Sequence, residues 1–228
     1  MAATPATKRI TQDRDVQIRI DAALLSGELD VPQNATGIVL FAHGSGSSRH
    51  SPRNRYVAEV IRKAGVGTLL FDLLTRREEE IDNYTREFRF DINLLAQRLV
   101  AATNWLAEEP ETSDLRPGYF GASTGGGGAL VAAAEMGEKV GAIVSRGGRP
   151  DLAASALRHV KAPTLLIVGG LDGPVIRMNE DAFAQLRCEK ELKIIPGATH
   201  LFEEPGKLEE VARLAATWFM KHLQHKKE

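Results

Sequence analysis

The feature that most constrains the fold of this chain is a regular alternation of short apolar runs with amphipathic segments. The runs are rich in branched aliphatic residues and end in glycine or a polar residue, a pattern typical of buried strands. They are GIVLFAHG (37–44), GTLLFDLL (67–74), GYFGA (118–122), VGAIVS (140–145), PTLLIVGG (163–170) and ELKIIPG (191–197). Strands of this kind, alternating with helices, predict an α/β fold with a mostly parallel central sheet and helices on both faces.

The segments between the runs carry apolar residues at helical spacing. Residues 53–64 present one apolar face and end before Gly65, and residues 92–106 and 207–223 follow the same pattern. At the start of the chain, VQIRI and AALLSGELDV predict a hairpin, so we expect the first part of the sheet to be antiparallel. We expect one domain over residues 1–228, because no internal repeat or low-complexity linker divides the sequence.

Composition narrows the classes of function. The chain is 43% hydrophobic and 26% charged with a formal net charge of -1, so its overall charge favours neither nucleic acid nor an anionic membrane. No apolar run approaches the roughly 18 residues of a membrane span, and MAATPATKRI lacks a signal-peptide core. A single cysteine, Cys188, excludes an internal disulfide. We expect a cytoplasmic protein without nucleic-acid or membrane partners, and the sequence does not define its oligomeric state.

One glycine-rich stretch, GASTGGGG (121–128), lies between a predicted strand and an alanine-rich predicted helix. Its first five residues match G-x-S-x-G, in which a serine sits on a sharp strand-to-helix turn and the flanking glycines let two backbones approach closely. Ser123 is therefore the candidate nucleophile. The motif does not require Gly126 to Gly128, for which we expect close packing of this helix against the sheet.

An acid and a base follow Ser123 along the chain. Asp172 comes just after the apolar run LLIVGG, and His200 comes just after the next predicted strand. A histidine can accept the serine proton, and a carboxylate can hold the imidazole in the required tautomer. Asp151, which follows another predicted strand, is the alternative acid. We prefer Asp172 because its strand directly precedes the histidine strand.

Backbone N–H groups near Ser123 are candidates for an oxyanion hole. Thr124 follows the serine at the start of the predicted helix, where N–H groups have no helical partner. The sequence HGSG (43–46) follows an earlier predicted strand, and Ser45 within it is the expected second donor. His43 is an alternative base, but it precedes the glycines of this loop, so we expect it to form structural hydrogen bonds.

Five stretches of the sequence resemble the α/β-hydrolases, and most of all the dienelactone hydrolase-like family: LFAHGSGSSRHSPRN, GYFGASTGGGG, SRGGRPDL, LLIVGGLD and PGATHLFEEP. The resemblance covers essentially the whole chain and implies an α/β-hydrolase fold. The chain departs from the family at one position, because dienelactone hydrolases use a cysteine nucleophile and Ser123 stands there instead. This difference favours esterase-type chemistry. Related domains also occur fused to a phosphoribosyltransferase domain.

These residues predict a serine hydrolase that cleaves small carboxylic esters or lactones through an acyl-enzyme. The chemistry needs no metal or organic cofactor, and the expected partner is a small-molecule ester. Two alternatives stay open: an acyltransferase or thioesterase that uses the same triad, and a non-catalytic binding protein on a hydrolase scaffold. All three triad residue types occur in order, which favours an enzyme over a binding protein.

The segment between Ser145 and Pro163, the usual place for an inserted lid, has room for one short helix, so we expect no large cap domain. An open site of this kind favours short acyl groups. The charged segment 75–88, which contains Tyr84 and Phe88, is expected to be a surface loop or short helix and a partial cover for the site.

Two further residues are candidates for substrate binding. Arg146 ends a predicted central strand, and a guanidinium has the geometry to bind a substrate carboxylate. The alternative for Arg146 is a structural role, for example holding its loop through Asp151. His50 follows the HGSG stretch and either lines the pocket or lies exposed. The histidines expected to be solvated are His159, His222 and His225.

Overall fold

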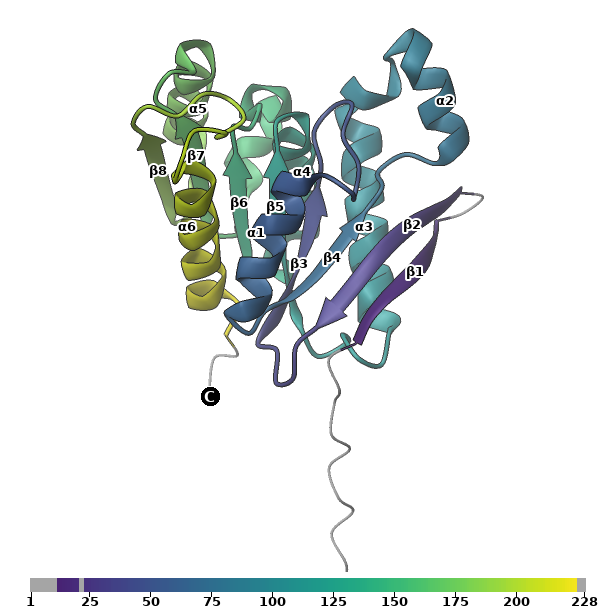
Figure 1. The fold of residues 1–228 in the computed structure, drawn as a ribbon. Helices are drawn as coiled ribbons and strands as arrows, with labels where there is room; N and C mark the ends of the chain where they lie inside the picture. The colour runs from purple at the N-terminus through teal and green to yellow at the C-terminus, as the bar shows by residue number, and fades with distance from the viewer. Residues whose placement is uncertain (1–11, 21–22, 225–228) are drawn as a thin grey trace, which may run out of the picture.

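An eight-stranded sheet organises the residues that the computed structural model describes, which are 12–20 and 23–224 (Figure 1). Its strands lie in the order β1-β2-β4-β3-β5-β6-β7-β8. They are β1 (Gln12–Ile20), β2 (Ala23–Val31), β3 (Gly37–Ala42), β4 (Gly67–Phe71), β5 (Arg116–Ala122), β6 (Ala142–Arg146), β7 (Thr164–Gly169) and β8 (Lys190–Ile195). The pairs β1–β2 and β2–β4 are antiparallel, and the others are parallel. This confirms the predicted hairpin and the mostly parallel sheet.

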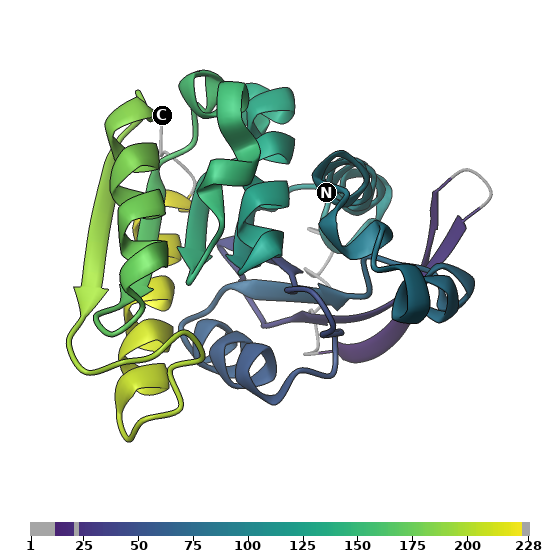
Figure 2. The same ribbon diagram turned by 90° about the horizontal axis from the view of Figure 1, so that it is seen from above.

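Helices cover both faces of the sheet, as the view from above shows (Figure 2). One face carries α1 (Pro52–Lys63) and α6 (Lys207–His222), and the other carries α3 (Ile92–Glu108), α4 (Thr124–Met136) and α5 (Gly173–Gln185). The other helical segments of the described residues are α2 (Arg76–Thr85) and the 3₁₀ segments η1 (Phe88–Phe90), η2 (Gly137–Lys139) and η3 (Pro150–His159). The helices predicted at 53–64, 92–106 and 207–223 correspond to α1, α3 and α6.

The central strands are apolar on both faces because helices cover both. Every residue of β3 is buried, and successive side chains point to opposite faces. Ile38 and Leu40 pack in the cluster that includes α3 and α4, whereas Val39 and Phe41 pack in the cluster that includes α1 and α6. The loops at the carboxyl ends of the strands are therefore the surface on which a site can form.

The segment α2–η1 stands apart from these layers, at the edge of the sheet toward which the parallel strands run (Figure 1). α2 begins with a capping box, in which the Thr75 hydroxyl accepts from the Glu78 N–H and the Glu78 carboxylate accepts from the Thr75 N–H at 2.7 Å. Glu78 also pairs with the buried Arg98 of α3 at 2.6 Å. The predicted loop or short helix is thus a helix anchored on α3, with Tyr84 92% exposed.

The connection between β6 and β7 holds only η3, so the fold carries no large cap at this point. η3 is a 3₁₀ segment with a kink at Ala154, whose φ is 38°. One expectation is wrong: the His222 side chain is only 9% exposed, because it packs against Trp218. His159 is exposed, and His225 lies outside the described residues. Within residues 12–20 and 23–224, no helix has the length and apolar character needed to cross a membrane.

Candidate active site

Ser123 lies in the turn between β5 and α4, with φ 51° and ψ -122°. A positive φ is uncommon for a residue other than glycine and carries strain that the surrounding structure must hold. The Ser123 N–H donates to the Arg146 carbonyl at 3.3 Å. The Ser123 carbonyl accepts from the N–H groups of Gly126 and Arg149, each at 3.0 Å. These bonds fix the sharp strand-to-helix turn that G-x-S-x-G predicts.

Close backbone contacts explain the two glycines of the motif. A Cβ atom on Gly125 would lie 2.1 Å from the carbonyl oxygen of Ala42, at the end of β3. A Cβ atom on Gly121 would lie 2.5 Å from the Cα atom of Gly126, across the turn. Both distances are far below van der Waals contact, so no other residue fits here unless the backbone moves.

The three glycines that follow face three different neighbours. A Cβ atom on Gly126 would lie 2.7 Å from Oγ of Ser145 in β6, which agrees with the expected packing against the sheet. A Cβ atom on Gly127 would lie 2.9 Å from a carbonyl oxygen in the segment after β6. A Cβ atom on Gly128 would lie 3.1 Å from Cβ of Leu95 in α3. The expectation is therefore correct for Gly126 and wrong for the other two, which approach the η3 region and α3.

Asp172 and His200 meet at the same edge of the sheet. Asp172 precedes the first residue of α5, and His200 lies in the loop after β8. Nδ1 of His200 lies 2.6 Å from Oδ2 of Asp172, whose side chain is 14% exposed. Because an ionised carboxylate can only accept, Nδ1 carries the hydrogen, and Nε2 is the basic nitrogen of the neutral ring.

The carboxyl end of β6 connects the serine turn with the histidine loop. Arg146, the last residue of β6, accepts the hydrogen bond from the Ser123 N–H. A Cβ atom on the next residue, Gly147, would lie 3.4 Å from Nδ1 of His200. The histidine ring therefore packs directly against Gly147, one residue from the strand end that holds Ser123.

The alternative acid, Asp151, is occupied by a different partner. Both of its carboxylate oxygens accept from the Arg149 side chain, each at 2.8 Å, in a bidentate ion pair. The hydrogen bonds to Asp151 raise the pKa of the Arg149 guanidinium. The structure thus pairs His200 with Asp172, the acid that the strand order favours, and pairs Asp151 with Arg149 rather than with Arg146.

The two candidate oxyanion donors lie side by side. Thr124 is the first residue of α4, and Ser45 lies in the loop after β3. Their hydroxyl oxygens are 3.0 Å apart. A Cβ atom on Gly44 would lie 3.1 Å from Cβ of Ser123, so this loop passes directly beside the candidate nucleophile. The structure therefore brings together the strand ends on which Ser45, Ser123 and Thr124 were predicted to lie.

His43 is buried at the base of the same loop and uses both ring nitrogens. Nε2 accepts from the Leu73 N–H at 3.0 Å, so Nδ1 carries the hydrogen and donates to the Gly44 carbonyl at 3.1 Å. Burial lowers the pKa of His43, against the opposing effects of the Gly44 carbonyl and the nearby Asp72 carboxylate. These contacts support the structural hydrogen-bonding role expected of His43.

A small pocket of about 80 Å³ opens beside the candidate oxyanion donors. The 43–48 loop and Thr124 line one part of it, and Asp82 and Arg89, from α2 and η1, line another. Asp72 also lines the pocket and accepts from the N–H of Arg49 at 2.8 Å, which ties the loop to the end of β4. The segment expected to be a partial cover therefore forms one wall of the pocket.

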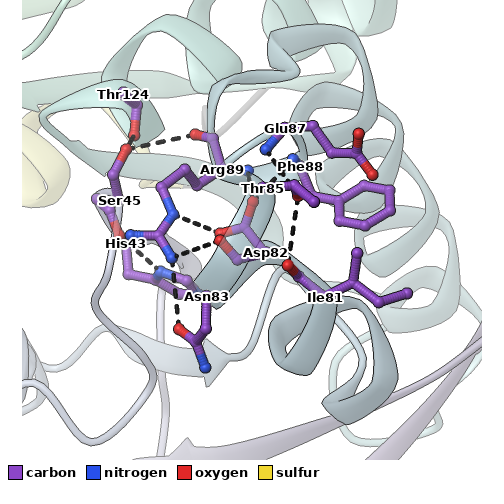
Figure 3. A network of polar contacts seen from close by, with 11 residues as sticks. His43, Ser45, Ile81, Asp82, Asn83, Thr85, Glu87, Phe88, Arg89 and Thr124 are labelled. Atoms are coloured by element: carbon purple, nitrogen blue, oxygen red, sulfur yellow. Dashed lines mark hydrogen bonds and ion pairs between the residues drawn. The ribbon is translucent and has the colours of Figure 1, made fainter.

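Asp82 and Arg89 are pocket residues that the sequence analysis missed. Asp82 is 2% exposed and forms an ion pair with Arg89 (Figure 3). The sequence of the charged run 76–80 is typical of a solvated helix face, and Arg76, Arg77, Glu79 and Glu80 are exposed. The helix spacing is the sequence feature that could have indicated the burial of Asp82. Asp82 follows Glu78 by four residues, or one turn, so the two side chains share a helix face, and that face is turned toward the body of the protein.

The two candidate substrate contacts do not line this pocket. Arg146 is 7% exposed, and its guanidinium carbon lies 5.9 Å from the centroid of the Phe202 ring. Burial and the nearby charge of Arg53 lower the pKa of Arg146 to about 10. His50 is exposed in the loop before α1. Within the described residues, no group of three or more His, Cys, Asp or Glu side chains could hold a metal ion.

The strand order, the strained turn at Ser123 and the pairing of His200 with Asp172 place this chain among the α/β hydrolases. The sequence pattern of the dienelactone hydrolase family matches residues 24–225, and the chain belongs to that family. A dienelactone hydrolase from Anabaena variabilis is 66% identical to this chain in sequence, and its crystal structure matches with a TM-score of 0.92 over 94% of this chain and 99% of that one. Est1E from Butyrivibrio proteoclasticus shares the fold at 16% identity, with a TM-score of 0.75 over 91% of this chain and 98% of that one.

Curated relatives carry a different name. Proteins from two strains of Mycobacterium tuberculosis, each named "Putative phosphoribosyl transferase", are 58% identical to this chain over 212 residues. The alignment covers 93% of this chain and 47% of each relative. This chain therefore spans about half the length of the curated relatives it matches, and their name belongs to the longer proteins.

Proposed function

We propose that this protein is a serine hydrolase of small carboxylic esters or lactones, with Ser123 as nucleophile, His200 as general base and Asp172 as the residue that orients the base. The observation that supports this most is the 2.6 Å contact between His200 and Asp172, at the sheet edge where Ser123 is held at φ 51°. Strained turns persist where the surrounding structure enforces them, and they cluster at active sites. This turn carries the hydroxyl that the chemistry needs.

The proposed reaction begins when Oγ of Ser123 attacks the ester carbonyl carbon and Nε2 of His200 takes the serine proton. Collapse of the tetrahedral intermediate breaks the ester bond, passes that proton to the departing alcohol oxygen and leaves an acyl-serine. Water then gives a proton to His200 and attacks the acyl carbon, and the second intermediate collapses to release the acid as His200 returns that proton to Oγ of Ser123. Asp172 stays ionised throughout and stabilises the imidazolium.

Negative charge develops on the carbonyl oxygen during both steps and requires N–H donors. We assign this role to the main-chain N–H groups of Ser45 and Thr124. Thr124 begins α4, so its N–H has no partner within the helix, and the helix dipole adds to the positive field. Loss of one such donor lowers the rate by about 10²–10³-fold.

The size of the site favours small substrates. The pocket beside Ser45 and Thr124 has a volume of about 80 Å³, and Ser123, Asp172 and His200 are not among its lining residues, so it supports room for only a small group next to the proposed oxyanion hole. The connection between β6 and β7 carries only η3, so no large cap encloses additional apolar surface. We therefore propose short acyl esters or small lactones as substrates, partly covered by α2 and η1.

The roles proposed for Arg146 and His50 need a separate test. One proposal is that Arg146 binds a substrate carboxylate. The alternative is that Arg146 supports the histidine loop, and the position of its buried guanidinium over the ring of Phe202, two residues after His200, favours this alternative. Hemisuccinate esters should gain roughly 10- to 150-fold over neutral esters if the guanidinium binds them, since hydrogen bonds to charged groups contribute about 1.5–3 kcal/mol. Arg146→Gln should abolish that gain alone. His50→Ala should raise KM if His50 contacts the substrate.

Other activities compete with hydrolysis on the same site. An acyltransferase or thioesterase would form the same acyl-serine but pass it to, or take it from, another nucleophile. A binding protein on this scaffold would form no acyl-serine. We propose hydrolysis with water as the acceptor, a small-molecule ester as the partner and the cytoplasm as the location. We do not propose phosphoribosyl transfer, because the relatives named for that activity are longer proteins and the alignment with this chain covers 47% of each.

A fluorophosphonate probe and a set of esters test the proposal. The wild-type protein should react with the probe at Ser123 and hydrolyse 4-nitrophenyl acetate, and Ser123→Ala should do neither while keeping its circular dichroism spectrum. Product analysis with a competing alcohol then separates hydrolysis from acyl transfer. A probe adduct on another residue, or full activity in Ser123→Ala, would remove Ser123 from the mechanism.

A further inference from the structure

Asp82 is the centre of a buried polar network between α2 and η1 (Figure 3). Oδ1 accepts from the N–H groups of Phe88 and Arg89, at 2.8 and 3.0 Å, and Oδ2 pairs with Nε of Arg89. Burial works to raise the pKa of this carboxyl, but the hydrogen bonds from the Arg89 main chain and guanidinium outweigh it and hold the pKa below its ordinary value. Asp82 is therefore a charged acceptor that fixes both the backbone and the side chain of Arg89.

Arg89 in turn contacts the loop after β3, which carries the proposed oxyanion donor Ser45. The Arg89 carbonyl accepts from the Ser45 hydroxyl at 3.4 Å. A Cβ atom on Gly46 would lie 3.4 Å from Nη1 of Arg89, so the guanidinium also packs against the next residue. Arg89 thus holds the loop at two successive residues.

The Ser45 hydroxyl also lies 3.0 Å from the Thr124 hydroxyl. A carbonyl can only accept, so Ser45 donates its hydrogen to Arg89 and accepts the hydrogen of Thr124. The hydrogen bonds then run in one direction, from Thr124 through Ser45 to the Arg89 carbonyl (Figure 3). Both proposed oxyanion donors are therefore bonded through their side chains to η1, and η1 is bonded to Asp82.

We propose that Asp82 is a positioning residue for the oxyanion hole: it holds Arg89, and Arg89 holds the Ser45 loop at the correct distance from Thr124. The proposal rests on the proposed hydrolase function. It gives Asp82 and Arg89 a role in placing the donors, in addition to the part of the pocket wall that they form. N–H donors stabilise a transition state only when they are correctly placed, and a displacement of about 1 Å can cost about 10²-fold in rate.

Two substitutions of Asp82 should give graded effects. Asp82→Asn keeps an oxygen for the two N–H groups but loses the charge that pairs with Arg89. Asp82→Ala loses both. We expect kcat for 4-nitrophenyl acetate to fall by on the order of 10²-fold in Asp82→Ala, and by less in Asp82→Asn. The affinity for a boronic acid that mimics the tetrahedral intermediate should fall in parallel with kcat/KM, whereas a loss of stability alone would leave that affinity unchanged.

Glu78→Gln is the matched control on the same helix. Glu78 forms an ion pair with the buried Arg98, and glutamine at this position still completes the capping box. This variant therefore weakens the anchoring of α2 without touching Arg89 or Ser45. It should lower the melting temperature while kcat and boronate affinity stay near the wild-type values.

A double-mutant cycle identifies the route of coupling. Ser45→Ala removes the hydroxyl that joins Arg89 to Thr124, so adding Asp82→Asn to it should lower kcat far less than Asp82→Asn does in the wild type. Full additivity, or an equal loss of kcat in Glu78→Gln, would overturn the proposal. If Asp82 variants react with fluorophosphonate at Ser123 at the wild-type rate, the positioning role is wrong and the hydrolase function stands. If the wild type does not react at Ser123, the hydrolase function itself is wrong.

Discussion

Asp172, and not Asp151, is the carboxylate that contacts His200: Oδ2 of Asp172 lies 2.6 Å from Nδ1 of the imidazole. Asp151 instead forms a bidentate ion pair with Arg149. Both acids follow strands in the sequence, and both lie toward the same edge of the sheet. The geometry separates them, because the turn after β7 faces the histidine loop and the segment after β6 turns into η3.

Replacing the two acids should therefore have very different effects. Asp172→Asn should lower kcat for ester hydrolysis by up to about 10⁴-fold, because an amide favours the wrong imidazole tautomer and cannot stabilise the imidazolium. Asp151→Asn breaks only the ion pair with Arg149 and should change kcat little. Steady-state kinetics on both variants, with folding checked by circular dichroism, decide between them. A larger loss in Asp151→Asn would move the triad acid to that residue.

His43 should make the stability of the fold sensitive to pH. Burial lowers the pKa of His43 from its ordinary value of 6.5, so the folded state keeps the ring neutral where the unfolded state accepts a proton. Stability from this group is complete above 6.5 and falls as the pH drops below that value toward the lowered pKa of the folded state. Urea unfolding at several pH values gives the free energy of unfolding as a function of pH, and below pH 6.5 this free energy should change less steeply with pH in His43→Gln than in the wild type. The exposed His159→Gln is the control, and an unchanged slope in His43→Gln would contradict the account.

The glycines of the turn should differ in their tolerance of alanine. Gly125→Ala places a Cβ atom 2.1 Å from a backbone oxygen. Overpacking typically costs about 1–3 kcal/mol, and we expect this variant to lose about 3 kcal/mol or more of its unfolding free energy. Gly128→Ala meets Leu95 at 3.1 Å, and its helix propensity gain of about 1 kcal/mol should offset most of that contact. Thermal unfolding of both variants measures the difference. Equal destabilisation would show that the backbone relaxes around Gly125.

Substrate length should follow from the small pocket and the missing cap. Acetate and butyrate esters of 4-nitrophenol should be cleaved with higher kcat/KM than esters of long fatty acids, because the pocket has a volume of about 80 Å³. A series of chain lengths at constant leaving group makes the comparison. A steady rise of kcat/KM with chain length would instead require an apolar channel outside this pocket.

The mostly parallel sheet could be predicted because strands buried on both faces read as continuous apolar runs, as GIVLFAHG does in β3, but the order of the strands could not. Ser123, Asp172 and His200 could be assigned to one edge of the sheet because each follows a predicted strand, and the carboxyl ends of parallel strands share one edge. The strand before His200 is β8, and the prediction that it is buried is wrong, because only its last residue is buried. The 3₁₀ character of η3 could not be predicted, because it depends on the kink at Ala154 and on packing against α4 and α5.

The hydrogen-bond network that runs from Thr124 through Ser45 and Arg89 to Asp82 could not be predicted, because it depends on contacts between distant segments. Asp82 sits among charged residues that read as solvated, and its burial follows only from the fold of η1 against α2. Likewise, Gly127 and Gly128 are required by the η3 region and by α3, which lie next to α4 only in the folded chain.

The most direct test of the central claim is the site of covalent labelling by a fluorophosphonate, read by peptide mass spectrometry. The account predicts one phosphonyl adduct, on the peptide that contains Ser123, with labelling slowed strongly in Asp172→Asn and absent in Ser123→Ala. It also predicts that ester hydrolysis is lost in step with labelling, and that an excess of a short ester slows both the labelling and the loss of activity. No adduct at Ser123 in an active, folded protein, or an adduct on another residue that tracks the activity, would contradict it.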